Sequence, residues 1–269
     1  MLLTKSYKGA YPFKLCTTSF IYQDGYVPNV KKLGPYIDEI ELLFFESKPG
    51  SLPKKNEIDE LSLLSKEFDF TYNIHLPTDI SFGDIDPSVR KNAVETILHV
   101  FDLTSPLSPS TCTLHLSYDE PSREMDKVKG WQEITRKTIK ELISFGVKAD
   151  EISIETLDYP FKWVEGIVRE FNFTVCMDIG HLIVREADIK TFFDSYCDSI
   201  SIIHLHGVEN GYDHLSLEKL SEERAGQVIE ILNKFTKVVS IEVFSYNDLT
   251  TSLKFLEKCW NKFDEFRNK

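Results

Sequence analysis

Short apolar runs of strand length alternate along the whole chain with amphipathic stretches of helix length. Runs rich in β-branched and aromatic residues predict strands, whereas apolar residues about three to four positions apart predict helices. The predicted strands span residues 14–18, 39–45, 70–76, 111–117, 151–156, 173–178, 200–206 and 238–244. The predicted helices span residues 29–36, 56–68, 87–104, 126–146, 161–171, 188–196, 216–235 and 249–263.

Three predicted helix boundaries have the chemistry of helix caps. Asp86-Pro87 precedes the third predicted helix, and Ser216 with Glu218 opens the seventh. Gly146 closes the fourth, because glycine readily adopts the left-handed conformation that ends many helices. These boundaries support the division of the chain into alternating elements.

The order of the predicted elements indicates one closed barrel. Strands alternating with helices throughout a chain of this length are typical of a parallel (β/α)₈ barrel, which belongs to the α/β class. We therefore expect a single TIM-barrel domain over residues 1–269, with residues 1–12 as an N-terminal extension. An open doubly wound sheet would usually carry a glycine-rich phosphate loop after the first strand. The segment TTSFIYQDG at that place is not such a loop.

The two faces of the predicted strands differ in polarity, since residues two apart in a strand face the same way. The apolar face, which suits packing against helices, contains Ile74, Leu76, Leu114, Leu116, Ile152, Ile154, Ile203, Leu205, Ile241 and Val243. The polar face, which would point to the barrel axis, contains Asn73, His75, Thr113, His115, Ser153, Glu155, Ser240 and Glu242. Strands covered by helices normally read as continuous apolar runs, so a polar inner face indicates a functional site.

Imidazole and carboxylate groups recur at or just beyond the ends of the predicted strands. The candidate metal ligands are His75, His115, Glu155, Asp178, His181, His204, Asp213, His214 and Glu242. Residues so far apart in sequence can converge if each lies at the same end of a closed barrel. His99 instead falls in a helical stretch and suits a structural role. The pattern predicts a polynuclear metal centre at the C-terminal ends of the strands.

The types of ligand narrow the choice of metal. Histidine and carboxylate ligands without cysteine fit Zn²⁺, Mn²⁺ or Fe²⁺ better than Mg²⁺, which prefers oxygen ligands. Cys16, Cys112 and Cys176 lie inside predicted strands and are interpreted as small buried hydrophobic residues. The five cysteines are an odd number without close pairing and do not predict a disulfide framework.

The charge of the chain limits the classes of partner. Its formal net charge is −12, whereas proteins that bind nucleic-acid backbones or anionic membranes usually present a basic face. The apolar runs are too short for a signal peptide or a membrane span. We expect a cytoplasmic protein that acts on a small molecule, with neither nucleic acid nor membrane as a partner. The sequence does not define an oligomeric state.

Short motifs at successive strand ends resemble those of the xylose isomerase-like barrels. In chain order they are HLP, LHL, IET, DIGH, HLH, DH and IEV. The resemblance extends through essentially the whole barrel. This superfamily includes sugar isomerases and epimerases and the endonuclease IV group of abasic-site nucleases, so the resemblance implies a TIM barrel with a divalent metal centre.

The resemblance implies different numbers of ions for the two branches of the superfamily. The epimerase branch holds one ion with four residues, which match Glu155, Asp178, His204 and Glu242. In the nuclease branch, residues matching His75 and His115 join them to hold two ions bridged by the glutamate. A third ion there is held by residues that match His181, Asp213 and His214. Because epimerases generally lack the complete set, its presence favours phosphoester hydrolysis.

Two positions depart from the nuclease pattern, and both affect the implied third ion. Asp213 and His214 are adjacent, whereas the nuclease pattern has one residue between the corresponding Asp and His. After His204 and Leu205, the chain has His206 and Gly207 in place of the usual Asn and Asp.

Longer segments resemble the cobamide-remodelling phosphodiesterases of this superfamily. These segments are YPFKLCTTSFIY, VPNVKKL, IDEIELLFFES, TYNIHLPTDI and DLTSPLSPSTCTLHLS. Such enzymes hydrolyse the phosphodiester that tethers the nucleotide loop to the corrin ring, so that the lower ligand can be exchanged. The resemblance implies cobamide hydrolysis with two or three Zn, Mn or Fe ions per chain, which would bind phosphate oxygens and activate the attacking water.

Roles can be assigned to individual residues on this hypothesis. Glu155 and Glu242 are the candidate catalytic residues, because either could accept a proton from the attacking water. The candidate substrate contacts are His206, Tyr22, Tyr26 and Phe82, and Lys48 and Arg185 are candidates for phosphate binding. The inward parity of His206 suits a structural hydrogen bond equally well.

Three other functions fit parts of the pattern. A sugar or sugar-phosphate isomerase or epimerase would use Glu155 and Glu242 as paired acid–base groups around one ion. An endonuclease IV-like abasic-site nuclease would share the ion set, but the net charge and the lack of basic loops disfavour it. A metal or corrinoid carrier would bind without turnover.

Overall fold

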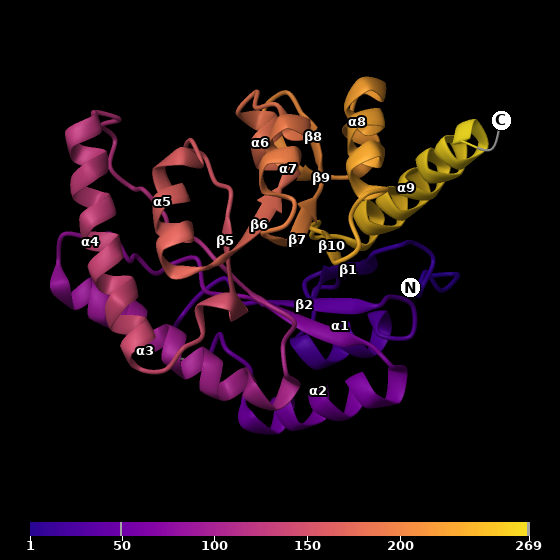
Figure 1. The fold of residues 1–269 in the computed structure, drawn as a ribbon. Coiled ribbons are helices and arrows are strands. Elements are labelled where there is room, and N and C mark those ends of the chain that lie inside the picture. The colour runs from indigo at the N-terminus through magenta and orange to yellow at the C-terminus, as the bar shows by residue number, and fades with distance from the viewer. Residues whose placement is uncertain (49, 268–269) are drawn as a thin grey trace.

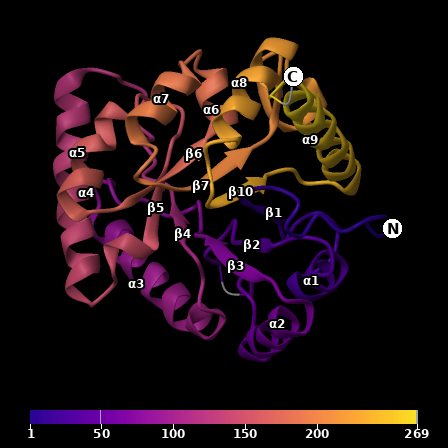
Figure 2. The same ribbon diagram turned by 45° about the vertical axis from the view of Figure 1, so that its right-hand side comes forward.

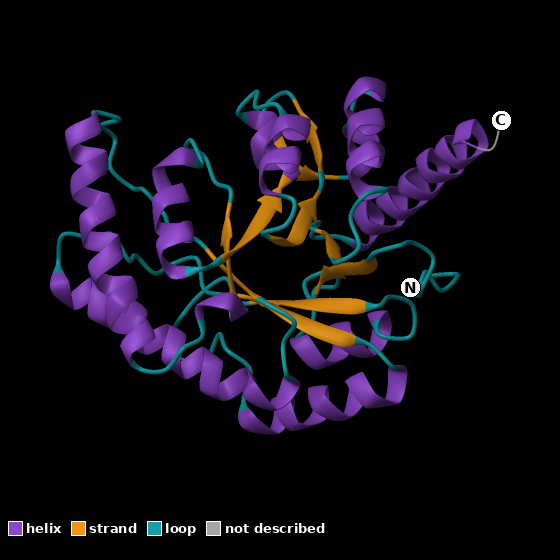
Figure 3. Cartoon of the chain, in the orientation of Figure 1, coloured by secondary structure: helices purple, strands orange, loops and turns teal. Residues whose placement is uncertain are grey.

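A ring of parallel strands closes on itself at the centre of the molecule. The computed structural model describes residues 1–48 and 50–267. Within them, each barrel strand is hydrogen-bonded to two neighbours in the order β1-β10-β7-β6-β5-β4-β3-β2. Helices surround the strands, as the two views in Figures 1 and 2 show. Figure 3 distinguishes helices from strands by colour. The expected (β/α)₈ TIM barrel is confirmed.

The barrel strands are short and almost entirely buried. They are β1 (Lys14–Thr18), β2 (Glu39–Leu43), β3 (Thr71–His75), β4 (Cys112–Leu114), β5 (Ile152–Glu155), β6 (Thr174–Asp178), β7 (Ile200–Leu205) and β10 (Val238–Ile241). Burial on both faces is expected for parallel strands that lie between a barrel interior and a layer of helices.

The helices begin and end near the predicted boundaries in most cases. They are α1 (Tyr26–Leu33), α2 (Lys55–Phe68), α3 (Pro87–Thr104), α4 (Met125–Ser144), α5 (Lys162–Phe171), α6 (Ile179–Val184), α7 (Ile189–Tyr196), α8 (Glu222–Leu232) and α9 (Tyr246–Arg267). The short 3₁₀ segments are η1 (Ser105–Leu107), η2 (Ala149–Glu151) and η3 (Leu217–Lys219). Asp86 caps α3 by accepting from Ser88 N, and Gly146 follows α4 with φ 92°.

Two helices differ from the prediction for identifiable reasons. Helix α1 begins at Tyr26 rather than at residue 29, because Pro28 lies in the first turn, where its missing N–H is not needed. Helix α8 begins after Ser221, whose hydroxyl accepts a hydrogen bond from Arg224 N at 3.2 Å. The predicted cap, Ser216, instead has its hydroxyl 2.6 Å from the Thr251 hydroxyl.

Three elements between β6 and α8 were not predicted. Helix α6 directly follows β6, because the Asp178 side chain accepts from His181 N at 2.6 Å and caps it. Strands β8 (Gly207–Glu209) and β9 (Tyr212–Leu215) form an antiparallel hairpin. Asn210 and Gly211 both have positive φ at its turn, as expected for an Asn-Gly hairpin.

The predicted alternation of strand faces agrees with the packing. All the apolar-face residues named above belong to one large buried cluster shared with the helices. Cys16, Cys176, Ile202 and Val238 form a separate buried cluster on strands β1, β6, β7 and β10. Ile202 lies two residues before His204, and Cys176 two before Asp178, so this small apolar cluster lies inside the barrel next to the predicted ligands.

The N-terminal residues before β1 pack on the outside of the barrel. Leu3 and Tyr7 are part of the large buried cluster. The Tyr246 hydroxyl, at the start of α9, donates to the Leu2 carbonyl oxygen at 2.8 Å. The chain start accordingly lies near α9 in Figures 1 and 2. In the part of the chain that the structure describes, helices with the length and apolarity to cross a membrane are not found.

We expect Ile203→Ala to destabilise the barrel strongly. Ile203 is fully buried between β7 and the helical layer, and truncating such a side chain leaves a cavity that typically costs about 2–5 kcal/mol. Urea denaturation monitored by circular dichroism would measure the change in the free energy of unfolding. Leu63→Ala, at an exposed position of α2, is the matched control and should change it by less than about 0.5 kcal/mol.

Candidate metal centre

The C-terminal ends of the strands bring the predicted ligands together. His75, Glu155 and Asp178 are the last residues of β3, β5 and β6. Because the strands are parallel, these ends lie at one end of the barrel. Among the described residues, three groups have ligand atoms within 4.8 Å of one another: His75, Glu155 and His204; Glu155, Asp178, His204 and Glu242; and Asp178, His181, His206 and His214.

One oxygen of Glu155 faces two histidines. Glu155 Oε2 lies 2.8 Å from His115 Nε2 and 3.2 Å from His75 Nε2. His75 Nδ1 lies 3.0 Å from the Leu76 carbonyl oxygen and must donate to it, since a carbonyl only accepts. Metal-binding histidines are commonly oriented in this way, with the second ring nitrogen donating to a carbonyl or carboxylate. His75 Nε2 is thus directed toward Glu155 Oε2.

The other oxygen of Glu155 faces a second group. Glu155 Oε1 lies 3.6 Å from His204 Nδ1. The same nitrogen lies 3.0 Å from Glu242 Oε2 and 4.0 Å from Asp178 Oδ2. All four side chains are buried. Glu155 therefore contacts one group of ligands with each of its two oxygens.

A third set of side chains lies closer to solvent. His181 Nδ1 donates to the Thr156 carbonyl oxygen at 3.0 Å, which leaves His181 Nε2 at 3.8 Å from Asp213 Oδ2. His214 Nδ1 lies 3.0 Å from Asp213 Oδ1. Adjacent strand residues normally face opposite ways, but His214 has φ 52°. This local change of backbone direction allows both neighbours to reach the site.

His206 positions Asp178 through a hydrogen bond. Its Nδ1 accepts from His214 N at 2.9 Å, so the proton lies on Nε2, which is 3.1 Å from both Asp178 oxygens. A Cβ at Gly180 would lie 1.9 Å from His206 Cε1, so only glycine leaves room for this ring. His206 is fully buried, and both of its ring nitrogens are hydrogen-bonded. Of its two expected roles, substrate contact and structural hydrogen bonding, this arrangement fits the second.

The second group has the features of an ion site. Both ring nitrogens of His204 and Glu242 Oε2 are buried and, among the described residues, have no hydrogen-bond partner. His204 Nδ1 and Glu242 Oε2 are close but misaligned for a hydrogen bond. Buried polar atoms without partners are costly, and a divalent ion in contact with His204 Nδ1 and Glu242 Oε2 would remove the cost for these two atoms. Imidazole and carboxylate ligands fit Zn²⁺, Mn²⁺ or Fe²⁺.

Charges within the centre shift the pKa values of its members. Burial raises the pKa of Glu155, but the positive charges of His115 and His204 outweigh burial and hold this pKa well below its usual range. Burial lowers the pKa of His181, but the carboxylates of Asp178 and Glu155 outweigh it and raise the pKa to about 11. The ligands thus stabilise one another as ion pairs when no ion is bound.

The pKa of His214 is also set by nearby carboxylates that outweigh the effect of burial. Burial lowers its pKa, but the nearby carboxylates of Glu242 and Asp213 outweigh burial and raise the pKa to about 9. At neutral pH the metal-free centre therefore contains protonated imidazoles beside ionised carboxylates. An incoming divalent ion has to displace these protons.

Glu41 is a member of the centre that was not predicted. It is fully buried in β2, with Oε1 3.0 Å from His204 Nε2 and Oε2 accepting from the Ser240 hydroxyl at 2.6 Å. Glu41 Oε1 and His204 Nε2 are not aligned as a hydrogen bond, but the charge of a carboxylate beside the far nitrogen of a candidate ligand histidine raises the basicity of the ring. The signal in the sequence was a carboxylate flanked on both sides by apolar residues in the segment IELLFF, since buried acidic residues are rare without a partner.

The aromatic residues expected to contact substrate differ in their positions. Tyr22 and Tyr26 are half-buried, and the Tyr26 hydroxyl donates to the Ser51 carbonyl oxygen at 3.0 Å. Phe82 is only 1 % exposed and belongs to the large buried cluster. Phe82 is therefore a core residue. A substrate contact would have to be exposed, so Phe82 does not have the position expected for one.

A cavity of about 420 Å³ opens beside the centre. It is lined by His115, His181, Asp213 and Arg185, among others. Arg185 also donates a hydrogen bond to the Tyr159 carbonyl oxygen, which fixes its guanidinium near the ligands. Lys48, the other candidate for phosphate binding, is instead exposed and lies 3.1 Å from Glu46.

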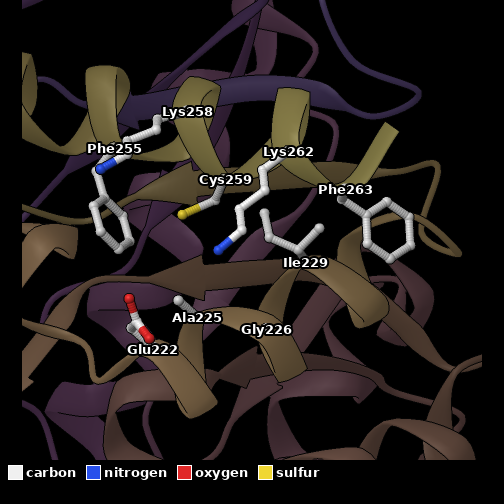
Figure 4. A pocket seen from close by; sticks show the side chains of 9 residues that line it. All are labelled: Glu222, Ala225, Gly226, Ile229, Phe255, Lys258, Cys259, Lys262 and Phe263. Carbon is white, nitrogen blue, oxygen red and sulfur yellow. The ribbon is translucent and has the colours of Figure 1, made fainter. Parts of the chain in front are cut away.

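A second cavity, of about 240 Å³, lies between α8 and α9 on the outside of the barrel. Figure 4 shows the Cys259 thiol and the Lys262 amine directed into it. The predicted ligands do not line this cavity. We therefore place the functional site at the strand ends.

The family of the chain follows from its sequence. Residues 27–259 match the model of the xylose isomerase-like TIM barrels, so the chain belongs to that family. Curated proteins give no match to the sequence.

Solved structures with the same barrel include proteins of several activities. The structure of a D-tagatose 3-epimerase-like protein has 20 % sequence identity and a TM-score of 0.78, over 94 % of this chain and 98 % of that one. Endonuclease IV from Thermus thermophilus has 13 % identity and a TM-score of 0.68, over 91 % and 99 %. The IolI protein with a bound zinc atom has 15 % identity and a TM-score of 0.69, over 93 % and 98 %. Identities this low establish a shared fold alone.

We expect the metal-free protein to be most stable between about pH 4.5 and 6.5. His214 contributes stability that is fully present below its ordinary pKa of 6.5 and is lost as the pH rises through about 9. Glu155 contributes stability that is present above its ordinary pKa of 4.5 and is lost in more acidic solution. Thermal unfolding of EDTA-treated protein from below pH 4.5 to above pH 9 would measure both limbs. Added Zn²⁺ should abolish the alkaline decline, and an unchanged alkaline limb would contradict the assignment of His214 as a ligand.

Glu41→Gln should weaken metal binding without unfolding the protein. The substitution keeps the volume of the side chain but removes the charge beside His204, and loss of such a partner typically lowers metal affinity about 10- to 100-fold. Calorimetric titration with Zn²⁺ would measure the affinity. Glu67→Gln, at an exposed position of α2, is the matched control, and equal affinities of the two variants would exclude this role for Glu41.

Proposed function

We propose that the protein is a metal-dependent phosphodiester hydrolase. The observation that carries the proposal is the contact of Glu155 with two groups of ligands at once, through His75 and His115 on one oxygen and His204 on the other. A centre for a single ion has no need of the first two histidines. The additional set of His181, Asp213 and His214 beside it supports a site for more than one ion.

The chain's own residues would orient a phosphodiester in the cavity beside the centre. Divalent ions held there would supply positive charge for the phosphate oxygens and a water of lowered pKa. Arg185 lies on the wall of the cavity and can donate to an anionic group. Glu242, next to His204 and 3.6 Å from His214 Nε2, is placed to accept a proton from the attacking water. The bound ions would also offset the acidic character of the chain.

A cobamide is the substrate that we propose. The support is the similarity of five segments, including YPFKLCTTSFIY and IDEIELLFFES, to the cobamide-remodelling phosphodiesterases, together with membership of the xylose isomerase-like family. The bond broken would be the phosphodiester between the nucleotide loop and the corrin ring. The products would be a corrinoid that has lost the loop and the released nucleotide fragment.

A sugar or sugar-phosphate epimerase is the second candidate. Glu155 and Glu242 both contact His204 Nδ1, which suits two carboxylates that move protons on either side of one ion. The similar structures described as epimerases also support this reading. The number of ions separates the candidates, because an epimerase of this kind uses one ion and the proposed hydrolase uses two or three.

Mass spectrometry of a cobamide incubated with the protein would test the proposed reaction. With Zn²⁺, Mn²⁺ and Fe²⁺ supplied in turn, we expect a corrinoid without its nucleotide loop in at least one case. Glu155→Gln should lose activity by about 10³-fold or more, because it weakens contacts to both groups of ligands. Metal analysis should give two or three ions per wild-type chain and fewer in the variant.

Glu223→Gln, on the exposed start of α8, is the matched control and should retain full activity and metal content. An intact cobamide with every metal, in protein shown to be loaded, would overturn the proposed substrate. One ion per chain together with epimerisation of a sugar would establish the second candidate instead. Retention of both metal and rate in Glu155→Gln would exclude either reaction at this centre.

A further inference from the structure

Three exposed phenylalanines form a continuous aromatic surface at the mouth of the barrel. Phe20, Phe45 and Phe244 are 46 %, 37 % and 37 % exposed. The ring centroids of Phe20 and Phe45 are 5.0 Å apart, and those of Phe45 and Phe244 are 5.7 Å apart, both with edge-to-face geometry. We call these three residues the aromatic shelf. Single exposed apolar residues are ordinary, but contiguous ones beside a functional site commonly mark a binding surface.

The backbone beneath the shelf is fixed by hydrogen bonds between neighbouring strands. The Thr18 hydroxyl, at the end of β1, donates to the Val243 carbonyl oxygen at 3.1 Å. The Ser19 hydroxyl accepts from Leu43 N, at the end of β2, at 3.1 Å. The Phe45 carbonyl oxygen accepts from the Thr78 hydroxyl at 3.1 Å. The backbone that carries the rings is therefore held in place before any ligand arrives, which reduces the entropy lost on binding.

The shelf is continuous with the metal centre. The rings of Phe244 and His214 are stacked, with centroids 5.2 Å apart and an angle of 19° between their planes. Phe244 also follows Glu242 by two residues in the loop that leaves β10. A molecule with one group at the ligands would extend over Phe244 and onto the rest of the shelf.

The mouth of the barrel is polar on the side away from the shelf. The shelf follows β1, β2 and β10, which are neighbours in the ring. The 420 Å³ cavity lies at the ends of β4, β5 and β6, and its lining includes Asp119, Asp158 and Arg185. A substrate that uses both sides must therefore have an apolar face and a separate anionic or polar part.

We propose that the aromatic shelf binds a broad, flat and largely apolar ring face of the substrate while the metal centre holds its anionic group. The proposal rests on the proposed function and specifies its substrate class, because a corrin is such a ring system and a simple sugar is not. Three rings in a row offer a surface wider than a single base or sugar ring would cover. Removing the central ring, Phe45, should break the surface into two separate parts.

Equilibrium dialysis of cobinamide, a corrin without the nucleotide loop, tests the shelf separately from hydrolysis. With the metal-loaded protein, we expect Phe45→Ala to weaken binding about tenfold, as for a central aromatic contact, and Phe45→Leu to restore part of it. Phe145→Ala is the matched control, because Phe145 is 61 % exposed but follows α4, at the other end of the barrel. It should bind as the wild type does.

The outcomes distinguish failure of the shelf from failure of the proposed reaction. Weaker cobinamide binding by Phe45→Ala, with intact cobamide in the hydrolysis assay, would support the shelf and overturn the reaction. Cobamide hydrolysis by the wild type, with equal cobinamide binding by Phe45→Ala, would support the reaction and overturn the shelf. Absence of cobinamide binding by the wild type would also overturn the shelf. If both hold, Phe45→Ala should raise KM about tenfold and leave kcat nearly unchanged.

Discussion

A buried carboxylate surrounded by imidazoles is the interaction on which the rest of the site depends. Glu155 lies within 3.6 Å of four histidines, namely His75, His115, His181 and His204. An isolated charge at this depth would be very costly, and only paired charges or bound ions offset that cost. The histidines come from four segments of the chain, so the closed ring of strands must form before the carboxylate is compensated. Folding and assembly of the site are therefore one event.

The sequence was sufficient to predict the barrel and the convergence of the residues at the strand ends. The period-two alternation in strands such as NIHLP and SIETL places apolar side chains toward the helices and polar ones toward the axis. Parallel strands then bring distant residues to one end of the ring. His75 and Glu155 could thus be placed together although 80 residues separate them. This inference needs only the parity within each strand, which is local, and the alternation of strands and helices along the chain.

Three residues were not predicted correctly from the sequence, because their positions depend on contacts between secondary-structure elements. Glu41 was overlooked because its partner, His204, is on a strand that is distant in the chain and joins it only across the barrel interior. Ser216 has the composition of a helix cap, but a tertiary contact with Thr251 engages its hydroxyl. Phe82 lies in a loop, where aromatic residues are commonly exposed, and is nevertheless covered by the core. Each case is a tertiary contact that overrides a local preference.

The β8–β9 hairpin lies outside the closed ring, and among the described strands its two members pair with each other. It nevertheless carries Asp213 and His214 to the centre and supports His206 through one backbone hydrogen bond. Since the ring closes without it, evolution can lengthen, shorten or exchange this hairpin while Glu155 and its neighbours stay in place. A family built on this barrel can therefore gain or lose the side chains at the positions of Asp213 and His214 by altering a single peripheral loop.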